Sequence, residues 1–352
     1  MKIKTFLRNI KNKESIQSES MNGISFNGED LNDTTYIDCV FNNCIFQTVN
    51  LKKSTFIGVN FNNCFFIETD LTGAMLNDIS FVNVEFDRSI FHEALFANIN
   101  FENTLFKSVH LYLIIISKSK FNKTTFESVK FDEMIFAKVE MENIIFKKSS
   151  FYRTSIVEAS MKNVKFDDVE IRKSIFNTLT LKNQDFSNKT LEHCHFIGSD
   201  LSGCKFMGAR LVQNFFKQTN LSNANFENVN ASLSIFEESN LTNTNFENAD
   251  LSKTSLIGAV GKNINFENAN MTSSNLSKIK VSKVNFRNTN LMYSLFDYSH
   301  IYDSTFYKSN LSFCSFHNVT HTNSIFVRTN KKFARYDDAK LLKAENWKSD
   351  AS

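Results

Sequence analysis

The sequence contains no proline and only 9 glycines in 352 residues. Compact proteins with many loops need both residues for their turns, so this scarcity favours one regular backbone conformation. The sequence also lacks a run of about 18 apolar residues, so we expect no membrane-spanning helix. Lys and Arg (40) nearly balance Asp and Glu (37), and the net charge of +3 is too small to indicate a nucleic-acid-binding protein.

The first residues and the cysteine content indicate the location of the protein. The segment Met1–Arg8 has no continuous apolar stretch and therefore does not look like a signal peptide. The 6 cysteines would suit a disulfide framework only in a small secreted protein. We therefore expect a cytoplasmic protein with reduced cysteines.

Large apolar residues recur at every fifth position from Phe26 to Phe326. The series begins with Phe26, Leu31, Tyr36, Phe41 and Phe46. It includes 33 of the 38 phenylalanines, and its clear exceptions are Gly261 and His321. A helix has a period of 3.6 residues and a strand a period of 2, so neither produces this pattern. We call these residues the central positions.

The residue two places before each central position is nearly always small or β-branched. All 6 cysteines occupy these small positions: Cys39, Cys44, Cys64, Cys194, Cys204 and Cys314. Free cysteine packs as a small hydrophobic residue, so we interpret the cysteines as part of the core and not as reactive thiols. Three polar residues at small positions, Gln184, Lys189 and Asn214, predict a local bend or bulge.

This pattern resembles the pentapeptide-repeat family, whose consensus is a small residue, Asn or Asp, Leu or Phe, and then two polar residues. Three segments match it residue by residue: Ala224–Asn228, Ala249–Lys253 and Ala269–Ser273. The resemblance extends from about Ile24 to Asn330. It implies an all-β fold, a right-handed quadrilateral β-helix with four pentapeptides per coil, one on each side. Central and small residues would both point inward.

With four pentapeptides per coil, residues twenty positions apart stack on each other. The central positions Phe26, Phe46, Phe66 and onward to Phe326 are all Phe, which predicts a continuous phenylalanine ladder along one side. The opposite side, ten residues out of step, is mixed and begins Tyr36, Phe56, Leu76. Stacked coils cover each other's edges and leave two open ends.

We expect three parts: an N-terminal amphipathic cap at residues 1–20, the β-helix at residues 21–330, and a C-terminal helix and tail at residues 331–352. Apolar residues Ile3, Phe6, Leu7 and Ile10 recur at helical spacing over residues 2–13 and predict a cap on the first coil. Because Lys and Arg surround them, contact of this segment with a membrane surface is the alternative.

The C-terminal helix is predicted from its charge order. Asp337 and Asp338 precede Leu341, Leu342 and Lys343, and this order of acids before bases suits a helix dipole. The helix would either cap the last coil or join two copies of the chain in a homodimer.

The sequence shows no catalytic motif. Gly198, Gly203 and Gly208 follow the five-residue repeat and do not form a phosphate loop. In His193-Cys194-His195 we expect the cysteine to point inward and both histidines outward, so we predict no metal site there. A β-helix filled with side chains has no pocket for convergent polar groups. We expect neither enzyme activity nor a cofactor.

Apolar residues also occupy outward positions next to the central positions of the mixed side, where the family prefers polar residues. They would form one apolar stripe, which we predict as the protein-binding surface, although β-branched residues also favour strands in general. The candidate residues are Ile57, Met75, Leu95, Ile115, Ile135, Val157, Ile175, Ile197, Phe215 and Ile235.

Three functions remain open at this point. The first is a protein-binding scaffold of unknown partner that does not bind nucleic acid directly. The second, implied by the resemblance, is protection of a type II topoisomerase (gyrase) by mimicry of DNA, for which only a short stretch around Glu227, Glu247 and Glu267 is acidic enough. The third is a bacterial effector delivered into host cells, although the effectors of this family carry a large non-repeat domain that we do not identify here.

Overall fold

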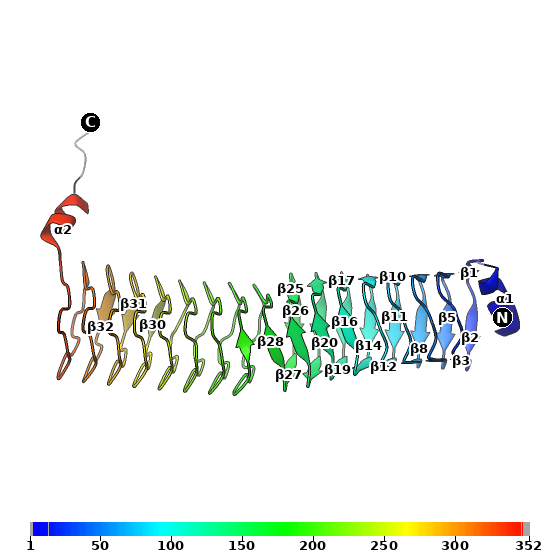
Figure 1. Cartoon of the computed structure of the whole chain (residues 1–352), viewed down its shortest axis with the longest axis horizontal. Coiled ribbons are helices and arrows are strands. Elements are labelled where there is room, and N and C mark those ends of the chain that lie inside the picture. Colours follow the sequence, from blue (N-terminus) through cyan, green and yellow to red (C-terminus); the bar gives the residue numbers. More distant parts are fainter. Residues whose placement is uncertain (1–2, 13, 346, 348–352) are drawn as a thin grey trace. The chain divides into compact units, whose positions relative to one another are not determined.

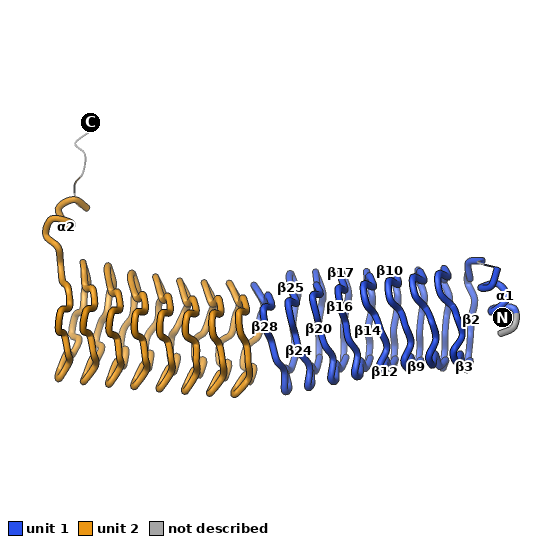
Figure 2. Tube along the Cα trace, in the orientation of Figure 1, with its two compact units in different colours: residues 1–180 blue, residues 181–352 orange. Residues whose placement is uncertain are grey.

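The computed structural model describes residues 3–12, 14–345 and 347, and it divides into two compact units, residues 1–180 and 181–352 (Figure 2). Each unit is a stack of four-sided coils, and its strands and bridges pair in parallel (Figure 1). The prediction of a four-sided β-helix is therefore confirmed. We name the four sides by their central residues: the Phe side (Phe26, Phe46), the Leu side (Leu31, Leu51), the mixed side (Tyr36, Phe56) and the fourth side (Phe41, Phe61).

In the first unit, each of three sides forms an eight-stranded parallel sheet. The mixed side contains β1 (Ile16–Gln17), β4 (Thr35–Ile37), β7 (Thr55–Ile57), β10 (Met75–Asn77), β13 (Leu95–Ala97), β17 (Ile115–Ser117), β21 (Ile135–Ala137) and β25 (Ser155–Val157). The fourth side contains β2 (Ser20–Asn22), β5 (Val40–Asn42), β8 (Asn60–Asn62), β11 (Ser80–Val82), β14 (Asn100–Glu102), β18 (Lys120–Asn122), β22 (Glu140–Glu142) and β26 (Ser160–Lys162).

The Phe side of this unit contains β3 (Ser25–Asn27), β6 (Ile45–Gln47), β9 (Phe65–Ile67), β12 (Glu85–Asp87), β15 (Leu105–Lys107), β19 (Thr125–Glu127), β23 (Ile145–Lys147) and β27 (Lys165–Asp167). The Leu side contains β16 (His110–Tyr112), β20 (Lys130–Asp132), β24 (Ser150–Tyr152) and β28 (Glu170–Arg172), preceded by isolated bridges. Partners are twenty residues apart on every side, as in Phe86↔Phe106 and Leu95↔Ile115. The twenty-residue coil predicted from the phenylalanine ladder is therefore confirmed in this unit.

The second unit keeps the twenty-residue spacing but is joined mainly by single bridges, such as Asn245↔Asn265. Its strands are β29 (Leu191–Glu192), β30 (Val260–Lys262), β31 (Lys280–Ser282) and β32 (His300–Tyr302), of which the last three form one sheet. Between the bridges the chain makes tight turns, in which the N–H of a small position donates to the carbonyl of the preceding central residue, as from Ala224 to Leu221 (3.0 Å).

Phenylalanine rings fill the core of both units. Along the axis they stack face to face: the ring centroids of Phe46 and Phe66 lie 4.6 Å apart with an interplanar angle of 5°. Around the coil they meet edge to face, as between Phe61 and Phe66 at 72°. Stacked and edge-to-face geometries are both favourable for aromatic pairs. One side chain therefore contacts rings in its own coil and in the neighbouring coils.

The corners explain how the chain turns with few glycines. The residue two places after a central position has a left-handed backbone, with φ near 52° at Asn63 and 54° at Asn83. Asparagine tolerates this conformation better than most residues. Its amide also bonds along the stack, since Asn83 Nδ2 donates to Asn63 Oδ1 (2.9 Å). Interactions between coils therefore stabilise the left-handed backbone at the corners. An isolated turn would need glycine to adopt this conformation.

Hydroxyl groups at small positions bond to the backbone of the preceding coil. Thr69 Oγ1 donates to the Phe46 carbonyl, and Thr219 Oγ1 donates to the Phe196 carbonyl, both at 2.7 Å. Asn214 follows the same rule: it is fully buried, its Nδ2 donates to the Leu191 carbonyl (2.7 Å), and its Oδ1 accepts from the Cys194 N–H (2.8 Å). A buried polar group at this position is therefore paired, and Asn214 does not by itself require a bulge.

Helix α1 (Ile3–Lys11) covers the core of the first coil. Phe6 is fully buried, with its ring 5.4 Å from that of Phe26, and Ile10 is also buried. Arg8 and Lys11 face solvent. The apolar face of α1 is therefore used in packing against the β-helix. Residues 1, 2 and 13, which the predicted cap also included, lie outside the described residues.

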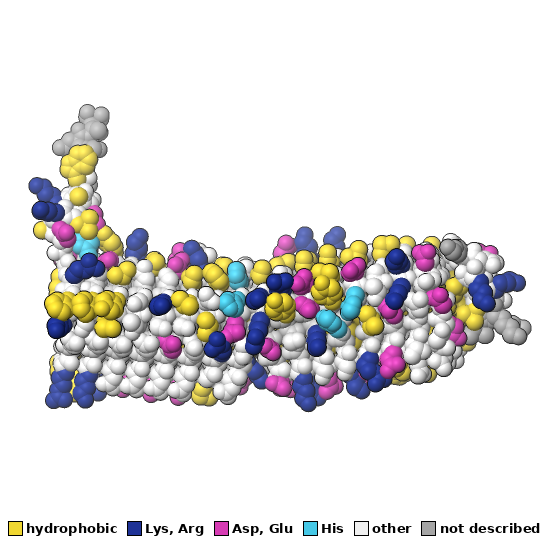
Figure 3. Space-filling model, viewed as in Figure 1, with side chains coloured by type: hydrophobic (Ala, Val, Ile, Leu, Met, Phe, Trp, Pro, Cys, Tyr) yellow, Lys and Arg dark blue, Asp and Glu magenta, His cyan; other side chains and the backbone are white. Residues whose placement is uncertain are grey.

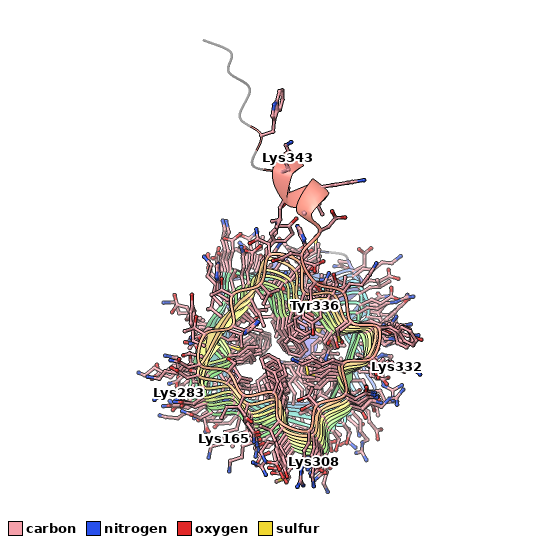
Figure 4. All side chains as sticks on the ribbon, turned by 90° about the vertical axis from the view of Figure 1, so that its left-hand side faces the viewer. Lys165, Lys283, Lys308, Lys332, Tyr336 and Lys343 are labelled. Carbon is pink, nitrogen blue, oxygen red and sulfur yellow. The ribbon has the colours of Figure 1, made fainter. Side chains whose placement is uncertain are left out.

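Helix α2 (Ala339–Glu345) stands away from the coils of the second unit, and none of its residues is buried (Figure 4). Two polar contacts link it to the coils: Glu345 accepts a hydrogen bond from the Tyr298 hydroxyl, and Glu345 Oε2 lies 3.3 Å from His317 Nε2. Among the central residues of the last coil, His321 and Lys331 are exposed and Phe326 is half-buried. Helix α2 therefore does not cap the last coil, which was one of the two roles considered for the C-terminal helix. The tail beyond it lies outside the described residues, apart from Trp347.

The phenylalanine ladder predicts a large difference between two Phe→Ala substitutions. Phe126 is fully buried between Phe106 and Phe146, at 4.9 and 5.1 Å, whereas Phe65 is exposed beside the core residue Phe66. Phe126→Ala should lower the free energy of unfolding by about 3–5 kcal/mol, and Phe65→Ala by about 0.5 kcal/mol or less. Urea titration measures both values, and equal losses would contradict the assignment of inward and outward positions.

The buried cysteines predict a slow reaction with thiol reagents. All six described cysteines are free and buried, and burial raises the pKa of Cys204 and of Cys314 to about 12. Because only the thiolate reacts, these two thiols should stay protonated and unreactive in the folded protein at pH 8. A thiol reagent should label all six after denaturation in urea. Rapid labelling of Cys204 or Cys314 before denaturation would contradict this arrangement.

Candidate protein-binding surface

Four large apolar side chains form a column on the outside of the mixed side in the first unit. Met75, Leu95, Ile115 and Ile135 open the strands β10, β13, β17 and β21, and they pair with one another in register. They are between 40% and 49% exposed. Figure 3 shows hydrophobic side chains along the edge that carries β10 and β17. We call these four residues the outer apolar column.

The alternation of strand residues places this column outside. Each member precedes a central residue that is buried, as Leu95 precedes Phe96 and Ile115 precedes Ile116. Successive side chains of a strand point to opposite faces, so both apolar neighbours cannot point inward. The equivalent outward residues of the fourth side are polar: Ser80, Asn100, Lys120 and Glu140. A general preference of strands for β-branched residues therefore does not explain the column.

Other predicted residues lie at the margins of the outer apolar column. Ile57 on β7 is exposed on the other flank of the central position, and it pairs with Asn77. Val157 on β25 is half-buried and pairs with Ala137. Ile175 is also half-buried and follows Ser155, which interrupts the column.

The predicted residues of the second unit form a group of their own. Phe215 bridges to His195 on one side and to Ile235 on the other, and Ser255 ends the group. Ile197, Phe215 and Ile235 are all half-buried. The stripe predicted from the sequence therefore appears as a well-exposed column in the first unit and a less exposed group in the second unit.

Ion pairs border the outer apolar column on both corners of the mixed side. On one corner, Arg153 Nη1 lies 2.7 Å from Glu133 Oε1. On the other, Lys138 Nζ lies 3.7 Å from Glu158 Oε2. An apolar centre with a charged rim is the usual anatomy of a protein-binding surface.

Sequence reasoning missed one residue of this surface. Leu113 occupies the corner position two places before Ile115, has a left-handed backbone (φ 54°) and is 40% exposed. The signal was present, because a large apolar residue at a corner departs from the polar residues that usually occupy it. The same signal marks Tyr293, Phe313 and Phe333 in the second unit, whose exposed rings stack 4.8 and 5.0 Å apart.

The Phe side also carries apolar residues at outward positions, but they do not form a continuous column. Phe65 and Ile145 are exposed, but Glu85 and Thr125 occupy the same outward column in the coils between them. Polar residues therefore separate the apolar ones, which distinguishes this side from the mixed side.

The described residues contain no group of three His, Cys, Asp or Glu side chains placed to hold a metal ion. In the His193-Cys194-His195 segment, Cys194 is buried, His193 is exposed and the His195 ring packs 4.4 Å from that of Phe215. Partial burial lowers the pKa of His195. A hollow of about 420 Å³ is lined by Ile10, Lys11, Asp30, Asn32 and Asp33 beside α1.

Among the described residues, no helix has the length and apolar content needed to cross a membrane. No match was found among curated protein sequences. Solved structures that resemble this one include HetL, a pentapeptide repeat protein involved in heterocyst differentiation regulation from the cyanobacterium Nostoc sp. strain PCC 7120. HetL is 18% identical, with 57% of this chain and 88% of that chain covered and a TM-score of 0.33.

Two further solved structures were found to be similar to this chain. A pentapeptide repeat protein from the thylakoid lumen of Arabidopsis thaliana is 28% identical over 28% of this chain and 66% of its own, with a TM-score of 0.23. QnrB1, a plasmid-mediated fluoroquinolone resistance protein, is 17% identical over 58% of this chain and 96% of its own, with a TM-score of 0.24.

Family models match more than half of the sequence. A model of a pentapeptide repeat region matches residues 119–196, and a model of eight-copy pentapeptide repeats matches residues 37–73, 64–103, 219–258 and 249–291. These matches lie in both units and agree with the twenty-residue coils that the structure shows. The chain belongs to the pentapeptide-repeat family and has its right-handed quadrilateral β-helix fold.

Proposed function

We propose that this protein is a non-enzymatic scaffold that binds a partner protein through the outer apolar column of its first unit. The observation that carries the proposal is the exposure of Met75, Leu95, Ile115 and Ile135 in four consecutive coils. Single exposed apolar residues are common, but a contiguous row of them usually marks an interaction surface.

The chemistry of the column suits a protein partner. Stacked coils lie about 4.8 Å apart, so the four side chains span about 15 Å. Leu113 and Ile57 widen this surface, and the Arg153–Glu133 ion pair lies on its rim. Burial of such side chains against an apolar surface contributes about 25 cal/mol per Å². The partner that fits is a protein that presents an apolar ridge of similar length.

A scaffold is favoured over an enzyme because the core is occupied by side chains. Phe106, Phe126 and Phe146 stack at 4.9 and 5.1 Å, and edge-to-face rings such as Phe131 fill the space beside them. The polar groups at small positions are used in bonds to the backbone, either between coils, as Thr219 is, or within one coil, as Ser239 is. Catalytic groups need a cleft in which they converge, and this interior supplies packing instead.

A scaffold is also favoured over a mimic of DNA. A mimic needs a continuous row of negative charge, whereas the first unit pairs its acids with bases between successive coils, as in Lys147–Glu127 (2.8 Å) and Lys162–Glu142. In the second unit, Glu267 is followed by Arg287 at 3.9 Å. The surface charge therefore alternates or reverses sign along the coils.

The double variant Leu95→Asn/Ile115→Asn tests the proposed surface. Since both side chains are exposed, the free energy of unfolding should change by no more than about 1 kcal/mol. Binding should weaken at least about tenfold, because the substitutions remove the apolar centre of the contact. A photo-crosslinking residue at position 135 first captures the partner in cells, and calorimetry then measures binding of the purified partner.

A matched control is the variant Phe65→Asn/Ile145→Asn, which removes two equally exposed apolar residues from the Phe side. It should bind the partner like the wild type. The proposal fails if Leu95→Asn/Ile115→Asn folds and binds normally, or if the control variant loses as much binding.

A further inference from the structure

The Phe side of the second unit has an outward column whose charge changes sign partway along it. Each residue of the column directly follows a central phenylalanine, and successive residues of the column lie in successive coils. From the coil of Phe226 onward, the column consists of Glu227, Glu247, Glu267, Arg287, Tyr307 and Val327. We call it the divided column.

Amide ladders hold this side in a regular geometry. On the other flank of the central phenylalanines, Asn225, Asn245, Asn265 and Asn285 are bridged in register. Asn265 Nδ2 donates to Asn245 Oδ1 and Asn285 Nδ2 donates to Asn265 Oδ1, both at 3.0 Å. Successive residues of the divided column are therefore one coil apart, about 4.8 Å along the stack.

The acidic half of the column is held by neutral amides. Asn265 Nδ2 lies 3.3 Å from Glu247 Oε2, and Asn285 Nδ2 lies 3.0 Å from Glu267 Oε2. The first cation met along the column is Arg287, whose Nε lies 3.9 Å from Glu267 Oε1. Like charges stacked in adjacent strands repel each other, so Glu227 and Glu247, which lie farther along the column from Arg287 than Glu267 does, would gain from an external cation.

The basic half is organised around Tyr307. Arg287, Lys308 and Arg328 lie 4.6, 5.4 and 5.9 Å from the centre of its ring, and Arg328 Nη1 donates to its hydroxyl (3.2 Å). Lys308 and Arg328 are exposed at the corner, and Figure 4 shows Lys308 pointing outward from the coils. Val327 adds an exposed apolar side chain.

One acid lies near this basic half, at the opposite corner of the Phe side. The carboxylate of Asp303 accepts a hydrogen bond from Asn323 Nδ2 at 3.1 Å. Lys283 occupies the same corner one coil earlier and points outward in Figure 4. Cations therefore dominate the half that begins at Lys283.

The fold does not require this separation of charge. In the first unit the equivalent column alternates in sign from coil to coil: Asp87, Lys107, Glu127, Lys147 and Asp167 pair in register. Alternation lets each residue find an opposite charge within the chain, as Lys147 does at Glu127 (2.8 Å). The divided column instead gathers acids in one half and bases in the other. When two copies of the column face each other in antiparallel orientation, the acids of each copy lie opposite the bases of the other.

We propose that a second copy of this chain docks on the Phe side of the second unit in antiparallel orientation. A two-fold axis between the coil of Glu267 and the coil of Arg287 places Glu247 of each copy opposite Lys308 of the other. The same axis places Glu227 opposite Arg328. A two-fold interface uses the same patch on both copies, and it therefore needs one surface that carries both signs.

The chemistry of this contact predicts how it behaves. Its charges are largely exposed, so they set orientation and specificity more than affinity. The association should be reversible, and it should weaken when the Debye length falls from about 10 Å at 0.1 M salt to about 3 Å at 1 M. The amide ladders and Val327 supply the uncharged part of the contact.

Sedimentation analysis of the full chain up to about 100 μM measures this association. At 0.1 M salt the wild type should show a species of twice the 40.5 kDa of the chain, and its dissociation constant should rise at least about fivefold at 1 M salt. Lys308→Glu/Arg328→Glu should weaken the dimer at least about tenfold. The control Lys253→Glu/Lys278→Glu makes the same change in net charge at exposed positions away from the Phe side and should leave the dimer intact.

A mixing experiment makes the test specific. Glu227→Lys/Glu247→Lys makes both halves basic, and Lys308→Glu/Arg328→Glu makes both halves acidic. Each variant alone should self-associate at least about tenfold more weakly than the wild type, whereas an equimolar mixture should form a heterodimer in which both contacts are restored. Circular dichroism checks the fold of each variant. If a charge-reversed variant does not fold, Lys308→Gln/Arg328→Gln replaces it. This variant only removes charge, and its dimer should be weaker than that of the wild type.

Three results would overturn the proposal. The first is a wild-type chain that stays monomeric over the whole concentration range at 0.1 M salt. The second is a mixture of the two reversed variants that remains monomeric. The third is a dimer that survives Lys308→Glu/Arg328→Glu but is lost in Leu341→Asp, because that dimer would form through helix α2.

Discussion

Backbone hydrogen bonds between residues about twenty positions apart are the interaction on which each unit depends. The N–H of one coil donates to a carbonyl of the next, as from Phe226 to Asn245 (2.6 Å) and from Phe286 to Thr305 (2.8 Å). These bonds leave few edges free within a stack. They also explain why strands of only three residues persist: each is stabilised by its neighbours on both sides and not by its own length.

This constraint turns each outer surface into a set of columns. Every residue has a counterpart one coil away, so each outward side chain belongs to a row of similar or complementary side chains. Rows of asparagine bond to each other, as Asn63 and Asn83 do, and rows of opposite charge pair, as Glu133 and Arg153 do. The outer apolar column and the divided column depart from these rules, since the first exposes a row of apolar side chains and the second gathers like charges in each of its halves. That is why we interpret the outer apolar column as a surface for a partner protein and the divided column as a surface for a second copy of this chain.

Much of the fold could be predicted from the sequence because the period is geometric. The five-residue series identified inward residues such as Phe126, and the twenty-residue series identified Phe106 and Phe146 as its neighbours. The corner residues were harder to predict. Leu113 and Phe313 have left-handed backbones, which their residue types disfavour, and the coil imposes this conformation through bonds that a local pattern does not reveal.

The candidate site was predicted only in part, for a related reason. The sequence correctly predicted that Leu95 and Ile115 point outward. The exposed fraction of an outward side chain, however, depends on the size of its neighbours in adjacent coils. Phe215 and Ile235 are half-buried for this reason, since they cover each other and His195. The placement of α2 depends on polar contacts of Glu345 with Tyr298 and His317, residues that are not neighbours in the sequence.

The central claim is that a coil of twenty residues, and not a repeat of five or ten, is the unit of stacking. Two internal deletions test it most directly. Removal of residues 81–100 takes out one complete coil and keeps every column in register, whereas removal of residues 81–90 places the Phe side over the mixed side. If the twenty-residue coil is the unit of stacking, the chain lacking twenty residues should have the higher melting temperature, although it buries fewer phenylalanines. A higher melting temperature for the chain lacking only ten residues would contradict this claim.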